Sequence, residues 1–71
     1  MKAQDFHKWC EVAGAKFAAD FTRLIGVNRN TAQEFYAAAE RGEDVPIKRP
    51  VALAMSAVAQ GLRPWDSYER E

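Results

Sequence analysis

The feature that most constrains this fold is the connection Gly26-Val27-Asn28, which separates two segments of helical character. Apolar residues recur at intervals of three and four on both sides of it: Phe17, Phe21, Leu24 and Ile25 before it, and Ala32, Phe35, Tyr36 and Ala39 after it. Two short helices joined by so few residues must cross steeply, and Gly26 can adopt the positive φ that such a bend requires. Asn28 can cap the second helix, because its side chain can accept a hydrogen bond from a free amide of the first turn. The sequence therefore predicts a helix-turn-helix.

Two further helices are predicted, one on each side of this pair. The first covers Ala3 to Ala13 and ends at Gly14, and the last has Pro50 in its first turn and ends at Gly61. Their apolar stripes are Phe6, Trp9, Cys10 and Ala13 in the first, and Val51, Ala54, Met55, Val58, Ala59 and Leu62 in the last. The helix after the connection is expected to continue to Glu40. No alternation typical of strands occurs, so the sequence predicts an all-α fold.

Five of the aromatic residues are expected to form the core instead of a stacking platform for single-stranded nucleic acid, because their spacing follows the apolar stripes. They are Phe6, Trp9, Phe17, Phe21 and Phe35. Cys10 lies on such a stripe and is expected to be inert, and His7 is expected to face solvent.

The chain is short, and 71 residues support a single core with little surface left for a deep catalytic pocket. No paired carboxylates, nucleophile with its base, or phosphate loop can be assembled, so we expect a binding protein without a cofactor and not an enzyme. Cys10 is the only cysteine, which excludes an intramolecular disulfide and a cysteine-based metal site and fits a cytoplasmic location. No segment has the length of a membrane span, and no membrane partner is expected. We assign residues 1–65 to the helix-turn-helix domain and residues 66–71 to a short charged tail.

The helix that follows Asn28 has a polar outer side over its first two turns, and its residue types are those that read bases in the major groove. Arg29 can pair with guanine, and the amides of Asn30 and Gln33 can pair with adenine. Other residues are expected to contact the DNA backbone or to cap the helix: Lys16, Asn28, Thr31, Lys48 and Arg49. Double-stranded DNA is therefore the expected partner.

The string Leu24-Ile25-Gly26-Val27-Asn28-Arg29-Asn30-Thr31 resembles the helix-turn-helix signature of the Cro/C1-type regulators of phage and bacteria, the XRE family. Residues 49–54 and 61–65 are similar to the closing helix of some short bacterial members. This resemblance implies a lambda-repressor-like DNA-binding domain, a compact bundle of four or five helices. It also implies that a homodimer binds a palindromic operator and regulates transcription, as a repressor or a Cro-like switch. The base-reading positions that it implies are Arg29, Asn30, Gln33 and Glu34.

Two questions stay open at the level of the sequence. Trp65 and Tyr68 follow the last helix, where a tryptophan can fold back onto its own core or pack across a two-fold axis, and we assign both to a dimer interface. The chain has ten basic and ten acidic residues, and this zero net charge supplies no overall attraction to phosphate. Together with Glu34, the neutral charge supports an alternative function: a helix-turn-helix protein that binds another protein instead of DNA, such as an antirepressor or antiactivator.

Overall fold

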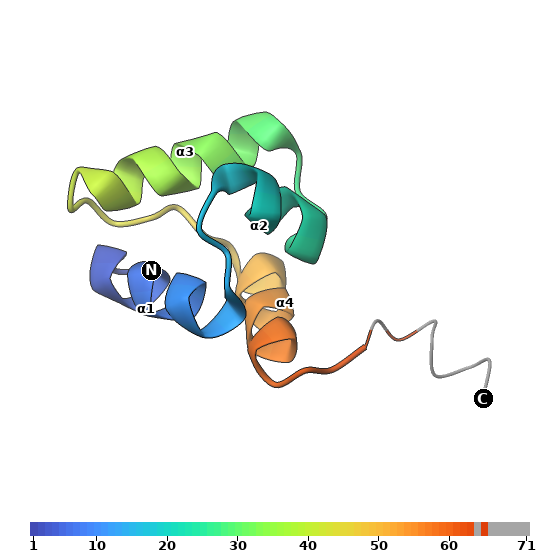
Figure 1. The fold of residues 1–71 in the computed structure, drawn as a ribbon. Coiled ribbons are helices and arrows are strands. Elements are labelled where there is room, and N and C mark those ends of the chain that lie inside the picture. The colour runs from blue at the N-terminus through green and yellow to red at the C-terminus, as the bar shows by residue number, and fades with distance from the viewer. Residues whose placement is uncertain (64, 66–71) are drawn as a thin grey trace.

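The computed structural model describes residues 1–63 and 65 of the chain. This part contains four helices joined by loops (Figure 1). They are α1 (Ala3–Ala13), α2 (Ala18–Ile25), α3 (Arg29–Glu40) and α4 (Arg49–Ala59). No strand occurs among these residues, so the all-α prediction is confirmed, and α1 has its predicted bounds. The same residues contain no helix with the length and apolar character needed to cross a membrane.

The backbone of each helix approaches those of two others. Side chains of α1 and α2 also touch, because the ring centroids of Phe6 and Phe21 are 5.7 Å apart. Helix α3 lies against α1 and α2, and α4 also lies against α1 and α2, whereas the backbones of α3 and α4 do not approach each other. Figure 1 accordingly shows α3 and α4 on opposite sides of the molecule. One side of α3 is exposed over its first two turns.

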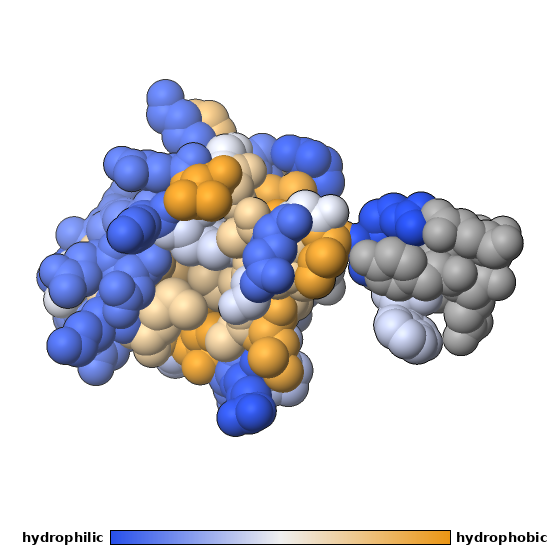
Figure 2. All heavy atoms as spheres, turned by 90° about the horizontal axis from the view of Figure 1, so that it is seen from below, coloured by the Kyte–Doolittle hydropathy of each residue, from blue (hydrophilic) through white to orange (hydrophobic). Residues whose placement is uncertain are grey.

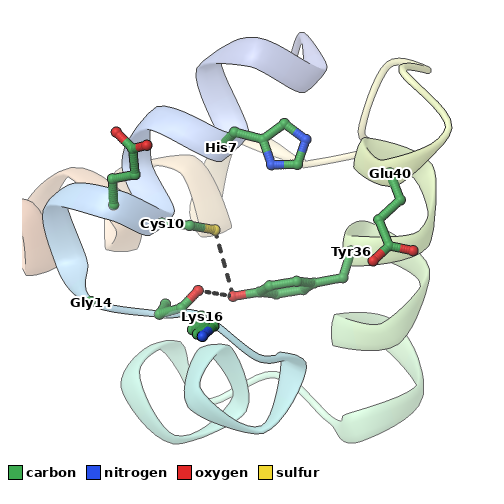
Figure 3. A pocket seen from close by; sticks show the side chains of 8 residues that line it. His7, Cys10, Gly14, Lys16, Tyr36 and Glu40 are labelled. Carbon is green, nitrogen blue, oxygen red and sulfur yellow. Dashed lines mark hydrogen bonds between the residues drawn. The ribbon is translucent and has the colours of Figure 1, made fainter.

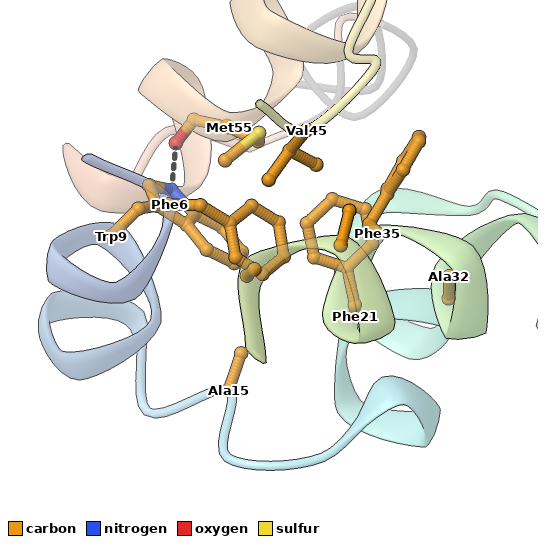
Figure 4. Packing of buried hydrophobic residues seen from close by; sticks show 10 residues of the cluster. Phe6, Trp9, Ala15, Phe21, Ala32, Phe35, Val45 and Met55 are labelled. Atoms are coloured by element: carbon orange, nitrogen blue, oxygen red, sulfur yellow. Dashed lines mark hydrogen bonds between the residues drawn. The ribbon is translucent and has the colours of Figure 1, made fainter. Parts of the chain in front are cut away.

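Three phenylalanine rings from α1, α2 and α3 form the centre of the core (Figure 4). Phe6 and Phe21 are fully buried, and Phe35 is nearly so. The ring centroids of Phe21 and Phe35 are 5.6 Å apart with an edge-to-face angle of 81°, and those of Phe6 and Phe21 are 5.7 Å apart. Such aromatic pairs contribute about 0.5–1.5 kcal/mol each beyond the burial of their area. The other buried residues are Trp9, Ala15, Ala32, Ala38, Ala39, Val45 and Met55.

The prediction that Phe17 belongs to the core is wrong, because its side chain is 63% exposed. Phe17 occupies the N-cap position of α2 with an extended backbone, φ −122° and ψ 158°. A residue outside the helix does not follow the angular repeat of the helix, so its side chain leaves the stripe that contains Phe21. Ala15, two residues earlier in the loop, is fully buried instead.

The far end of α4 differs from the prediction for a similar reason. Leu62 is 53% exposed and Ala59 is also exposed, although both were expected on the apolar face of this helix. Helix α4 ends at Ala59, and Gly61 then has a positive φ of 73°, which redirects the chain before Leu62. Within α4 only Met55 is fully buried, and Val51, Ala54 and Val58 are half-buried.

Val45 was not predicted to be buried, yet only 1% of it is exposed. It lies in the extended segment between α3 and α4 and pairs with the first residue of the chain. The amide of Val45 donates to the Met1 carbonyl at 2.7 Å, and the Met1 ammonium donates to the Val45 carbonyl at 3.0 Å. This pairing holds the segment over the core, where Val45 covers the phenylalanine cluster (Figure 4).

Candidate nucleic-acid interface

The turn between α2 and α3 has the backbone conformation that the sequence predicts. Gly26 has φ 94°, in the left-handed region, and its amide donates to the Thr22 carbonyl at 2.9 Å. A Cβ atom added at Gly26 would meet nothing within 4 Å, so glycine is favoured there by its φ and not by lack of space. Val27 is half-buried and packs against the core beneath the turn.

The start of α3 is fixed by the predicted cap. The side-chain oxygen of Asn28 accepts a hydrogen bond from the Thr31 amide at 2.8 Å, and its carbonyl accepts one from the Ala32 amide at 3.1 Å. Asn28 itself is extended, with φ −72° and ψ 163°. The cap satisfies one of the amides that a helix start leaves without a partner, so the first turn of α3 is held in place.

Helix α3 has one buried face and one exposed face. Its buried residues are Ala32, Phe35, Ala38 and Ala39. Its exposed residues in the first two turns are Arg29, Asn30, Gln33 and Glu34, which we call the outer stripe. Residues at this spacing share one side of a helix. No outer-stripe side chain forms a hydrogen bond or an ion pair with another described residue, so all four are available to a partner.

The predicted backbone contacts come from several places in the fold. Lys16 is exposed in the loop between α1 and α2, with its ammonium 5.6 Å from the centre of the Phe17 ring. Lys48 and Arg49 are exposed at the start of α4, whose backbone does not approach α3. Asn28 and the outer stripe therefore lie together at the start of α3. Lys16, Lys48 and Arg49 lie on other parts of the chain.

The start of α2 already holds a carboxylate. Asp20 accepts a hydrogen bond from the Phe17 amide at 3.1 Å and forms an exposed ion pair with Arg23 at 3.5 Å. A negative charge at a helix start interacts favourably with the helix dipole, and it reduces the attraction of that end for an added anion. The amides beside Lys16 are therefore less available to a phosphate than the sequence alone indicates.

Of the two predicted dimer residues, Trp65 is described and Tyr68 lies outside the described residues. Trp65 is 78% exposed, which is inconsistent with folding back onto its own core. Val12, Leu53 and Leu62 are further large apolar side chains with exposures above half. Figure 2, which views the side of α1 and α4, shows apolar side chains gathered over the middle of this face.

The sequence analysis missed a hollow between α1, the following loop and α3 (Figure 3). Its volume is about 560 Å³, and its lining residues are His7, Cys10, Glu11, Gly14, Ala15, Lys16, Tyr36 and Glu40. The Tyr36 hydroxyl donates to the Ala15 carbonyl at 2.7 Å and accepts from the Cys10 thiol at 3.5 Å. No pattern in the sequence identifies this hollow, because its walls meet only through tertiary packing.

Burial governs the protonation of the two side chains in the wall of this hollow. It raises the pKa of the Cys10 thiol, an effect that the hydrogen bond to Tyr36 partly offsets. It also raises the pKa of Tyr36 well above its ordinary value. The hydrogen bond to Cys10, the negative charge that Cys10 carries once it is deprotonated, and the charge of Asp20 act in the same direction. Both groups are therefore neutral at physiological pH.

No known family, curated protein or solved structure matches this chain. The geometry of the outer stripe and of the hollow is therefore the basis for assigning a function. In the described part of the chain, no three His, Cys, Asp or Glu side chains are grouped in a way that could hold a metal ion.

Proposed function

We propose that this protein is a sequence-specific DNA-binding regulator of transcription that inserts α3 into the major groove as the second helix of a helix-turn-helix. The observation that carries the proposal is the outer stripe. Arg29, Asn30 and Gln33 are exposed, share one side of a helix and have no partners among the described residues. Arginine and amide side chains at the start of a helix are the groups that make bidentate contacts with guanine and adenine.

The rigidity of the support also favours this function. Base reading requires side chains on an element whose position is fixed, because a small displacement breaks paired hydrogen bonds. The face of α3 opposite the outer stripe is anchored by Phe35, which packs on Phe21 of α2, and by the Asn28 cap. Helix α3 is thus held along its length and at its first turn.

We propose further that the protein binds as a homodimer in the cytoplasm and has no catalytic activity. Dimerisation is supported by the exposed apolar side chains of Leu53, Leu62 and Trp65. Residues 51–61, which form most of α4 and the turn that follows it, include no charged residue. A two-fold contact places each residue near its own copy, so an uncharged surface can self-associate without like-charge repulsion.

The neutral charge of the chain sets an expectation for how DNA binding depends on salt. With few cations near α3, few counterions are released on binding, so affinity should fall only gently as salt rises. Binding to DNA of random sequence should be weak for the same reason. Specificity would then depend mainly on base contacts by the outer stripe.

Selection of bound duplexes from a random pool, at low and at near-physiological salt, tests the proposal. We expect enrichment of a palindrome whose half-sites lie about one helical turn apart. Arg29→Ala removes the donors that pair with guanine, so it should relax the preference at one base position. Lys8→Ala, which removes a cation from the exposed side of α1, serves as the control and should leave the selected sequence unchanged.

A second candidate is favoured by one specific observation: the carboxylate of Glu34 lies within the outer stripe and is exposed. A negative charge there repels phosphate, and on a neutral protein no excess of positive charge offsets it. The same stripe would then bind another protein. If no sequence is enriched at either salt concentration while Arg29→Ala abolishes binding to an isolated protein partner, the DNA-binding proposal is wrong and this second function holds.

A further inference from the structure

The hollow beside Tyr36 lies apart from the outer stripe and suggests a second binding site. Its volume of about 560 Å³ is within the range of about 300–1,000 Å³ that is typical of small-molecule sites. None of the outer-stripe residues lines it. Its walls come from α1, the loop between α1 and α2, and α3, so a bound molecule would contact three elements.

The inner wall of the hollow is uncharged and aromatic. Tyr36 packs edge-to-face against Phe6 on one side, with ring centroids 5.1 Å apart, and borders the hollow on the other. Its hydroxyl proton and the thiol proton of Cys10 are already engaged in hydrogen bonds. The wall therefore offers a ligand an apolar ring surface and no free proton donor from these two groups.

The rim of the hollow is negative. Glu11 on α1 and Glu40 on α3 are exposed, and neither forms an ion pair with another residue that the structure describes. The one lysine at the rim, Lys16, holds its ammonium over the ring of Phe17, which is not part of the lining. Glu40 follows Tyr36 by one helical turn, and Figure 3 shows its side chain beside the Tyr36 ring.

We propose that this hollow binds a small organic cation, a primary ammonium group attached to a flat apolar body. The ammonium would donate to the carboxylate of Glu40, which lies beside the Tyr36 ring, and the apolar body would pack on that ring. A carboxylate and the face of an aromatic ring both attract an ammonium ion. An anion would meet two carboxylates and one lysine at this rim, so the charge of the site disfavours nucleotides and phosphate as ligands.

Titration with phenethylammonium chloride, followed through the amide signals of the protein by nuclear magnetic resonance, tests the proposal. We expect saturable shifts centred on Gly14, Ala15 and Tyr36. Phenylacetate has a similar body with the opposite charge, and it should give no saturable shift at these positions. Equal binding of the two compounds, or shifts that fail to saturate, would overturn the proposal.

Two variants of α3 sharpen the test. Glu40→Gln should weaken the affinity for phenethylammonium by about 1.5- to fivefold, the range expected for one exposed charge pair. Glu34→Gln, which removes an exposed carboxylate from the same helix outside the hollow, should have no effect. An equal loss in both variants would mean that the protein attracts the cation through its general charge, and the site would be rejected. Because the measurement uses no DNA, its outcome is independent of the proposed regulatory function.

Discussion

The indole N–H of Trp9 donates a hydrogen bond of 2.7 Å to the backbone carbonyl of Met55, inside the core (Figure 4). The two residues are far apart in the sequence, and their contact joins α1 to α4. A buried donor loses water on folding and needs a protein partner, so this bond also fixes which part of α4 lies against α1. Tryptophan thus fulfils a second role here beyond filling space.

Trp9→Phe is expected to destabilise the protein by roughly 1–3 kcal/mol, because it removes the bond to Met55 and leaves a small void. Urea unfolding measures this change in the free energy of unfolding. Val12→Ala on the exposed side of α1 is the control and should change stability by less than about 0.5 kcal/mol. A Trp9→Phe protein as stable as the parent would show that the hydrogen bond contributes nothing.

Thr22→Val is expected to stabilise the protein by up to about 1 kcal/mol. The Thr22 hydroxyl oxygen is buried and has no hydrogen-bond partner among the described residues, so it loses water without compensation. Valine has nearly the same shape and lacks the hydroxyl. Thr22→Ser keeps the hydroxyl and removes the methyl group, and it should lower the thermal midpoint while valine raises it.

Asn28→Ala and Asn30→Ala should separate stability from recognition. Asn28 caps α3, so its loss is expected to cost about 1 kcal/mol in stability, whereas Asn28→Ser should retain most of it. Asn30 is exposed without a described hydrogen bond, so its replacement should leave the free energy of unfolding nearly unchanged. If the proposed function is correct, Asn30→Ala instead relaxes the preference for adenine at one position of the selected duplex. A crossed result, with Asn30 stabilising the fold and Asn28 dispensable, would contradict both assignments.

Stability is expected to fall at alkaline pH through Cys10 and Tyr36. Their pKa values in the folded state are raised above the ordinary values of 9.0 and 10.0, so the folded protein holds these protons more tightly than the unfolded chain. The resulting stability is fully present below about pH 9 and is lost as pH rises further, because the unfolded chain releases its protons first. Tyr36→Phe should flatten this fall in urea midpoints measured from pH 8 to above pH 10. An equally steep fall in that variant would assign the effect to other groups.

The helices and their caps could be predicted from the sequence because they depend on neighbouring residues. The bounds of α1, the positive φ of Gly26 and the cap by Asn28 all follow from local patterns. Phe17 and Leu62 were misplaced because each lies just outside a helix, where helical periodicity no longer fixes the direction of a side chain. Val45 was missed because its burial depends on pairing with Met1, which lies far away in the sequence.

The candidate site divides in the same way. The outer stripe lies on a single helix, so the spacing of its residues in the sequence was enough to predict that they share one side. The hollow beside Tyr36 requires α1 and α3 to meet at a particular angle, and that angle is set by ring packing in the core. Periodicity assigned Cys10 and Tyr36 to the core as a whole, whereas both are half-buried and border open space.

The exposure of the outer stripe has a consequence for how this protein can evolve. The outer-stripe side chains are exposed and form no hydrogen bond or ion pair with a described residue, so replacing them breaks no described bond. The identity of the molecule that binds there can therefore change while the scaffold stays intact. Related chains would be expected to keep Phe6, Phe21 and Phe35 and to differ at Arg29, Asn30, Gln33 and Glu34.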